Sequence, residues 1–191
     1  TGPFFDLFIL IANPGDADAL VEATYLLPDG TAVVRPYAVA AASRFTIWVD
    51  AEAPALANTA VSTVLRSTND VPIVVDRAMW WPDGGWYEAH AAAGATSTGI
   101  AWALADGEVD ATRHMETYLL IANTSGEPAD VRVTLLFEDG SSAERTFSNV
   151  AANSRFTVPV GPHFPQADGR RFGALIESVG YSLPEIKDAA G

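Results

Sequence analysis

The sequence contains no cysteine, and its three histidines are His90, His114 and His163. The lack of cysteine excludes disulfides, thiolate nucleophiles and cysteine-based metal sites. No two histidines have the spacing that metal ligands often show, such as i and i+4 on a helix. A zinc site is therefore disfavoured, and the fold has to be stabilised by packing.

Basic residues are also scarce, because 11 lysines and arginines stand against 24 aspartates and glutamates, a formal net charge of −13. A protein that binds nucleic acid needs basic groups to neutralise phosphates, so nucleic acid is disfavoured as a partner. The sequence has no apolar run of about 18 residues, so we expect no membrane insertion. An acidic surface leaves cation binding open.

Catalytic signatures are missing as well. The sequence has no G-x-S-x-G elbow, no H-E-x-x-H motif, no glycine-rich phosphate loop and no G-x-G-x-x-G fingerprint. These absences remove the usual motifs of hydrolases, metalloproteases and nucleotide-binding enzymes. We therefore expect a protein that is not an enzyme and needs no cofactor.

An internal repeat dominates what is present. The segment LFILIAN at Leu7–Asn13 returns as TYLLIAN at Thr117–Asn123, 110 positions later. After one inserted residue the offset becomes 111, and VAAASRFTIWV ending at Val49 matches VAANSRFTVPV ending at Val160. A repeat of this length predicts two similar modules within the 191 residues.

Both copies have the pattern of β-strands. Apolar residues alternate with polar ones, and Asp29-Gly30 and Asp139-Gly140 stand between such runs, which is a strong hairpin signal. The predicted strands are 5–13, 19–27, 31–39, 43–49, 60–67, 71–80, 116–123, 130–137, 141–150, 154–160 and 171–178.

The spacing of these strands predicts an all-β fold. We expect two tandem immunoglobulin-like antiparallel β-sandwich modules related by the repeat of about 110 residues. A flattened barrel is the alternative. The modules are expected at 1–96 and 97–191.

The two copies do not match at their ends. The run VPIVVDRAMWW at Val71–Trp81 has no equivalent strand in the polar segment SLPEIKDAAG, and GIAWALADG at Gly99–Gly107 has no equivalent before Thr1. We therefore expect the first module to lack its first strand and the second its last. Either neighbouring copies complete the sheets, or the sequence simply stops early.

Five segments together resemble a known kind of repeat: WALADG, ETYLLIAN, the Asp-Gly hairpin, ANSRFTV, and PIVVDRAMWWPDGGWYEAHAAAG of the first copy. They are similar to tandem β-sandwich repeats of large secreted or surface proteins of actinobacteria, Chloroflexi and relatives, which are related to domains of unknown function. The resemblance implies an extracellular or cell-surface location and a non-catalytic role.

Aromatic residues gather in WWPDGGWYEAH. Flat rings beside polar groups can stack on sugars, so this segment is a candidate carbohydrate-binding platform. The alternative is that the rings cement an interface between modules. The candidate residues are Trp80, Trp81, Trp86, Tyr87 and His90.

The acidic run DGEVD is a candidate calcium site, with Asp106, Glu108 and Asp110 at alternate positions. It lacks the full pattern of a calcium loop, and three acids near a turn are often only a solvated loop.

Two functions follow from these observations. The first is a non-catalytic extracellular structural or adhesive module that extends or assembles a larger bacterial surface protein or filament, with neighbouring copies or modules of the same protein as partners. The second is a carbohydrate-binding module, with glycans as partners.

Overall fold

The computed structural model describes residues 5–83 and 86–180, without the side chains of residues 81–83 and 86–88. The protein is all-β, and its strands pair antiparallel in several sheets, as the sequence predicts. It divides into two compact units, Thr1–Thr98 and Gly99–Gly191, which are called unit 1 and unit 2 below. No helix of the described residues is long and apolar enough to cross a membrane.

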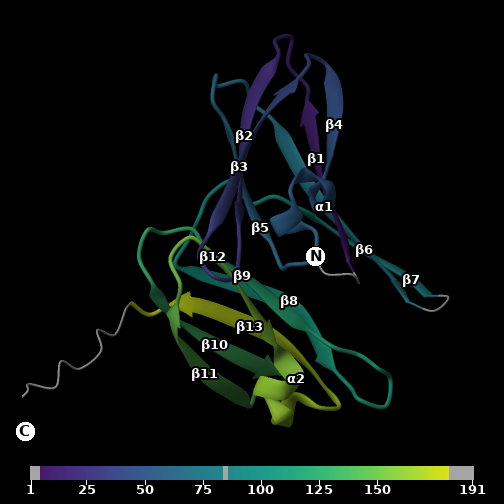
Figure 1. Ribbon diagram of the computed structural model, residues 1–191. Coiled ribbons are helices and arrows are strands. Elements are labelled where there is room, and N and C mark those ends of the chain that lie inside the picture. The colour runs from purple at the N-terminus through teal and green to yellow at the C-terminus, as the bar shows by residue number, and fades with distance from the viewer. Residues whose placement is uncertain (1–4, 84–85, 181–191) are drawn as a thin grey trace, which may run out of the picture. The chain divides into compact units, whose positions relative to one another are not determined.

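Unit 1 contains two sheets, with strand orders β4-β1-β6-β7 and β3-β2-β5 (Figure 1). The elements are β1 (Asp6–Asn13), β2 (Ala19–Leu26), β3 (Ala32–Val39), β4 (Ser43–Trp48), α1 (Val49–Glu52), the 3-10 turn η1 (Pro54–Leu56), β5 (Ser62–Ser67), β6 (Val74–Asp83) and β7 (Trp86–Ala93).

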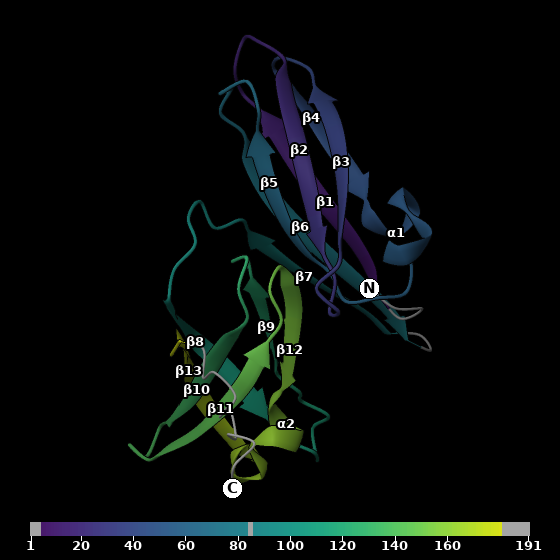
Figure 2. The ribbon, with the colours of Figure 1, turned by 60° about the vertical axis from the view of Figure 1, so that its left-hand side comes forward.

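The two sheets of unit 1 lie face to face and share one core (Figure 2). β1 supplies Leu7, Ile9 and Ile11 from one sheet, and β2 supplies Val21 and Tyr25 from the other. Because side chains alternate along a strand, every second residue of each strand reaches this core.

Unit 2 contains sheets with strand orders β11-β10-β13-β8 and β12-β9. Its core draws on both sheets, for example Val133 and Leu135 of β10 and Leu119 of β9. The elements are β8 (Ala101–Val109), β9 (Tyr118–Asn123), β10 (Ala129–Phe137), β11 (Ser142–Val150), β12 (Ser154–Pro159), α2 (Val160–His163), η2 (Pro165–Ala167) and β13 (Arg170–Ser178).

The repeated segments pair in the same way in both units. Asn13 lies opposite Ser43 in the β1–β4 ladder, and Asn123 lies opposite Ser154 in the β9–β12 ladder. Both Asp-Gly segments close hairpins, with positive φ at Gly30 (83°) and Gly140 (81°). The strand registers therefore follow the sequence repeat.

The inserted residue of the second copy lies in a β-bulge. The register of β10 and β11 shifts between Ala129 and Val131, where β11 carries one residue more than β10. Asn149 has a φ of 59° there, and its backbone N–H donates a hydrogen bond of 2.8 Å to Asp130 Oδ1. A bulge absorbs an extra residue without turning the following side chains away from the core.

Two predicted strand ends differ from those in the structure. The strands predicted to run to Val49 and Val160 end one residue earlier, because a short helix begins at each valine and a proline-initiated turn follows. Asp106-Gly107 does not form a turn, since β8 continues to Val109 with a bulge opposite β13.

Candidate functional site

The predicted aromatic platform is split between the two faces of the β6–β7 hairpin. Met79 lies opposite His90 and Trp80 lies opposite Ala89, so Trp80 and His90 point to opposite sides of the sheet. Trp80 is 50% exposed. His90 lies near Arg77, with 3.5 Å between its Nδ1 and Arg77 Nη2, and burial lowers the pKa of Arg77.

The side chains of Trp81, Trp86 and Tyr87 lie outside the described residues. Their backbones belong to the ladder, in which Trp81 pairs with Glu88, Tyr87 with Pro82 and Trp86 with Asp83. The structure therefore places the segment in a hairpin and leaves the positions of these rings open.

Trp80 lies with two other aromatic residues on the outer face of the same sheet. We call this surface the outer aromatic face, and it consists of the rings of Phe8, Trp48 and Trp80 and the carboxylate of Asp6. Phe8 and Trp48 are stacked, with 6.3 Å between ring centroids and 19° between ring planes. Trp48 is 49% exposed and donates from Nε1 to Asp6 Oδ1 at 3.3 Å. Asp6 lies opposite Trp80 in the β1–β6 ladder. Exposed rings beside a carboxylate are a surface on which a sugar can stack and hydrogen-bond.

Phe8 and Trp48 are not among the residues that the sequence predicts for this surface. The run LFILIAN is apolar at almost every position, so it does not reveal which residues face outward. The structure shows which face is outward: the alternate residues Leu7, Ile9 and Ile11 are buried, so Phe8 and Leu10 lie on the other face of the strand.

Two of the three acidic candidates in unit 2, Glu108 and Asp110, form salt bridges with arginines. Asp110 Oδ2 accepts from Arg113 Nε at 2.7 Å, and Asp110 Oδ1 accepts from the backbone N–H of Thr112 at 2.9 Å. Hydrogen bonds from Thr112 and Arg113 lower the pKa of Asp110.

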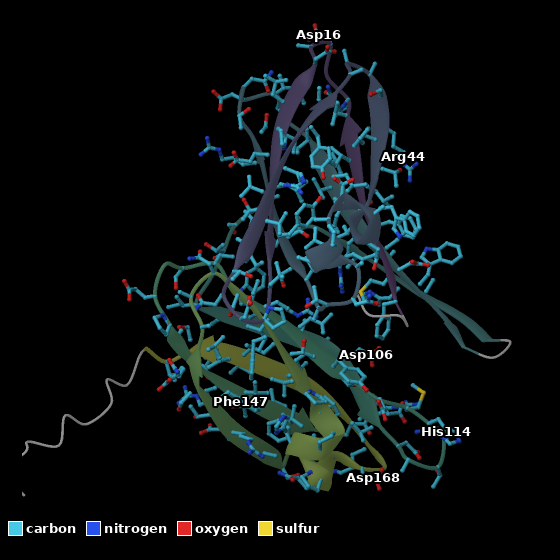
Figure 3. All side chains as sticks on the ribbon, viewed as in Figure 1. Asp16, Arg44, Asp106, His114, Phe147 and Asp168 are labelled. Atoms are coloured by element: carbon cyan, nitrogen blue, oxygen red, sulfur yellow. The ribbon has the colours of Figure 1, made fainter. Side chains whose placement is uncertain are left out.

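Glu108 forms a salt bridge with Arg113 and lies 3.4 Å from Arg171 Nε. Asp106 is exposed on β8, in the bulge before Glu108 (Figure 3). In the part of the chain that the structure describes, no group of three or more histidines, aspartates or glutamates is arranged to hold a metal ion. The geometry favours a salt-bridged turn over a calcium loop.

A shallow pocket of about 350 Å³ lies in unit 2 between the end of β8, the start of β9 and α2. Both acidic residues that line the pocket accept a hydrogen bond. Glu116 accepts from the Tyr118 hydroxyl, and Asp168 accepts from the backbone N–H of Ala111. Hydrogen bonding to Glu116 raises the pKa of Tyr118.

The two units differ in how equivalent strands are paired. β1 lies between β4 and β6, whereas β9 pairs with β12 alone among the described residues. We call the side of Tyr118–Asn123 that faces away from β12 the β9 edge. β13 lies between β10 and β8, whereas β5 pairs with β2 alone among the described residues. Each unit thus has an open strand edge where the other unit has an additional strand.

Apolar side chains are exposed on β8, in the sheet of unit 2 that does not contain β9. In the β13–β8 ladder, Ala174 lies opposite Leu104 and Ile176 lies opposite Trp102. Ala174 belongs to the core, so Leu104 and Trp102 lie on the core-facing side of the sheet. They are nevertheless 46% and 44% exposed. The facing sheet, β12-β9, has only two strands to cover this four-stranded sheet.

No protein-family model matches the chain, and no curated protein matches it. Among solved structures, the crystal structure of Thermotoga maritima 1070 is similar, with a TM-score of 0.44 and 18% identity over 50% of this chain and 79% of that chain. The resemblance to actinobacterial and Chloroflexi surface repeats stays a prediction.

Proposed function

We propose that the protein is a non-catalytic structural module that extends or assembles a larger extracellular bacterial surface protein or filament. The two units act as tandem immunoglobulin-like β-sandwich repeats, and neighbouring copies or modules of the same protein are the partners. One observation carries the proposal: β1 and β13 each have two partner strands, while their counterparts β9 and β5 each have one in the described residues. An open edge offers backbone donors and acceptors to a further strand.

Sedimentation velocity over a range of protein concentrations tests this function. We expect dimers or open-ended oligomers that grow with concentration, because β5 and β9 lie in different units and each lacks, among the described residues, the second partner strand that its counterpart has. The same runs with calcium and with a chelator test the acidic segment at Asp106, Glu108 and Asp110. A monomer at every concentration contradicts assembly.

The outer aromatic face favours a second candidate function, binding of carbohydrate. Phe8, Trp48 and Trp80 present exposed or half-exposed rings on one side of a rigid sheet, and the Asp6 carboxylate lies among them. Sugar C–H faces stack on such rings, while a carboxylate accepts hydrogen bonds from sugar hydroxyls.

A glycan array followed by calorimetry tests the second function. Trp48→Ala and Trp80→Ala should each weaken binding of any glycan that the array identifies. Trp102→Ala is the matched control, since Trp102 is similarly exposed, at 44%, but belongs to unit 2. Binding that survives both changes in unit 1 contradicts a role for this face.

A further inference from the structure

The strands β1 and β9 are equivalent in sequence and in pairing, but they differ in their second partner. β1 pairs with β4, and β9 pairs with β12, in the same register once the repeat offset is applied. On its other side β1 pairs with β6, from Ala12 opposite Val74 to Asp6 opposite Trp80. Unit 1 therefore shows that a strand with the sequence of β6 pairs with the repeated strand sequence that β1 and β9 share.

Burial records the difference between the two strands. Ile11, which lies opposite Val75 of β6, is 0% exposed, and Asn13 at the end of β1 is 1% exposed. Their counterparts Ile121 and Asn123 on β9 are both partly exposed. The apolar side chain of Ile121, whose counterpart Ile11 is fully buried, is thus partly exposed to water at the β9 edge.

We propose that the β9 edge binds a β-strand with the side-chain pattern of β6, supplied by a neighbouring repeat of the same kind. The strand pairs antiparallel with β9 in the register in which β6 pairs with β1. This inference rests on the proposed function and deepens it, because it identifies the strand that joins neighbouring copies.

The pattern of β6 fits the chemistry of the β9 edge. On β6 the core-facing residues Val75 and Met79 lie opposite Ile11 and Leu7, and both pack against the core of unit 1. In the same register on β9, the equivalent of Val75 lies opposite Ile121. An apolar side chain at that position covers Ile121, as Val75 covers Ile11.

The added strand also widens the sheet that faces β8. A third strand beside β9 widens the two-stranded sheet β12-β9, which shares its core with the four-stranded sheet that contains Trp102 and Leu104. Both side chains already point to the core-facing side, so their burial needs no rearrangement of β8. Burial of apolar surface supplies the binding free energy, and the backbone ladder sets the direction.

The absence of cysteine allows a direct test of this register. The probe is a synthetic peptide of residues 71–80, VPIVVDRAMW, with Val74→Cys or Asp76→Cys. The protein carries Ala122→Cys or Leu120→Cys in β9. The β1–β6 register aligns Val74 with Ala122 and Asp76 with Leu120, after the offset of 110 is applied.

We expect disulfide trapping of the two aligned pairs to be about tenfold faster than trapping of the two crossed pairs. Directly opposite residues bring Cα atoms to about 5 Å, whereas a diagonal shift of two residues moves them to about 7 Å or more, beyond disulfide reach. Ala12→Cys in β1 is the matched control, because β6 already occupies that position, and it should not trap the peptide.

Equal trapping of aligned and crossed pairs, or equal trapping at Ala12→Cys and Ala122→Cys, overturns the proposal. So does the absence of trapping in all four combinations. This test is separate from the assembly test, because the peptide reports on the β9 edge even when the chain sediments as a monomer. Conversely, assembly without trapping of the peptide leaves the structural function standing and rejects this edge.

Discussion

The side-chain amide of Asn13 donates a hydrogen bond of 3.0 Å to the carbonyl oxygen of Val39 at the end of β3. The same amide nitrogen also donates to the carbonyl oxygens of Ala17 and Ala40. Asn123 repeats this arrangement in unit 2, with Val150 as the equivalent acceptor at 3.2 Å. One asparagine in each unit therefore holds together the end of a strand and two neighbouring loops.

Replacing these asparagines should destabilise the unit that contains each one. Asn13 is 1% exposed, so Asn13→Ala leaves buried carbonyls without a donor and should cost about 2–3 kcal/mol. Asn123 is partly exposed and water reaches its partners, so Asn123→Ala should cost about 1 kcal/mol. Urea denaturation of both variants measures the difference.

Asn58→Ala is the control for this pair, since Asn58 is exposed. Its free energy of unfolding should stay within about 0.5 kcal/mol of the parent protein. Equal effects of Asn13→Ala and Asn58→Ala would show that the shared hydrogen bonds do not stabilise the fold.

Gly107 marks a close contact in unit 2. A Cβ atom at this position would overlap with the ring of Phe172, a core residue that is 4% exposed. Gly107→Ala should therefore force the ring aside and lower the free energy of unfolding by about 1–3 kcal/mol. Thermal unfolding of this variant measures the loss.

Gly126→Ala is the matched control, because a Cβ atom at Gly126 meets no other atom within 4 Å. This change should leave the melting temperature nearly unchanged. A Gly107→Ala variant as stable as the control would show that β8 and β13 can separate at this point without loss.

Much of the fold could be predicted from the sequence, because its strands carry a period of two and its hairpins carry Asp-Gly turns. Val131, Val133 and Leu135 alternate with polar or exposed residues, and all three are buried in β10. β7 escaped prediction because WYEAHAAA is rich in alanine, a residue that disfavours strands. It forms a strand because β6 offers it a partner along its whole length.

The site residues were harder to predict, since a candidate surface depends on which face of a strand a residue occupies. Trp80 and His90 are close in sequence, but they lie on opposite faces of the hairpin. Trp48 is 32 positions from Trp80, but β1 brings both to the outer aromatic face. Strand order determines this placement, and local sequence does not encode strand order.

Two tyrosine hydroxyls, those of Tyr25 and Tyr37, lie together in unit 1 beside Glu52. The Tyr37 hydroxyl donates to Glu52 Oε2 at 2.6 Å and lies 2.9 Å from the Tyr25 hydroxyl. Burial, and then hydrogen bonding to Glu52 and Tyr25, raise the pKa of Tyr37 well above its usual value. Burial likewise raises the pKa of Tyr25.

A pKa raised in the folded state means that folding favours the protonated phenol. This contribution to stability is complete below about pH 10, the pKa of an unfolded tyrosine, and is lost as the pH rises above it. We expect the free energy of unfolding to fall between about pH 10 and about pH 11, and to fall less steeply in Tyr37→Phe. Urea denaturation at successive pH values measures both slopes.

Tyr118→Phe is the control for the alkaline effect. Tyr118 is also bonded to a glutamate, but it is 50% exposed, so solvent screens its interaction. Its replacement should leave the slope of stability against pH unchanged. The same slope in the parent protein and in Tyr37→Phe would rule out the buried pair as the source.

The exposed side chains of β8 should contribute to binding at the β9 edge. Trp102→Thr and Leu104→Thr remove apolar surface that an added strand would help to bury, and each should weaken binding of the 71–80 peptide by about threefold to tenfold. Because both residues are nearly half exposed in the chain itself, stability should change by only about 0.5 kcal/mol. Calorimetric titration of the peptide, beside urea denaturation, separates the two effects.

Val34→Thr is the matched control, since Val34 is 48% exposed on β3 of unit 1, in a sheet that contains neither β8 nor β9. It removes a similar apolar side chain without touching the proposed binding surface, so the affinity for the peptide should not change. An equal loss of affinity in Val34→Thr and Trp102→Thr would point to general surface hydrophobicity. A loss confined to β8 would mean that the exposed core-facing residues of β8 take part in binding the added strand.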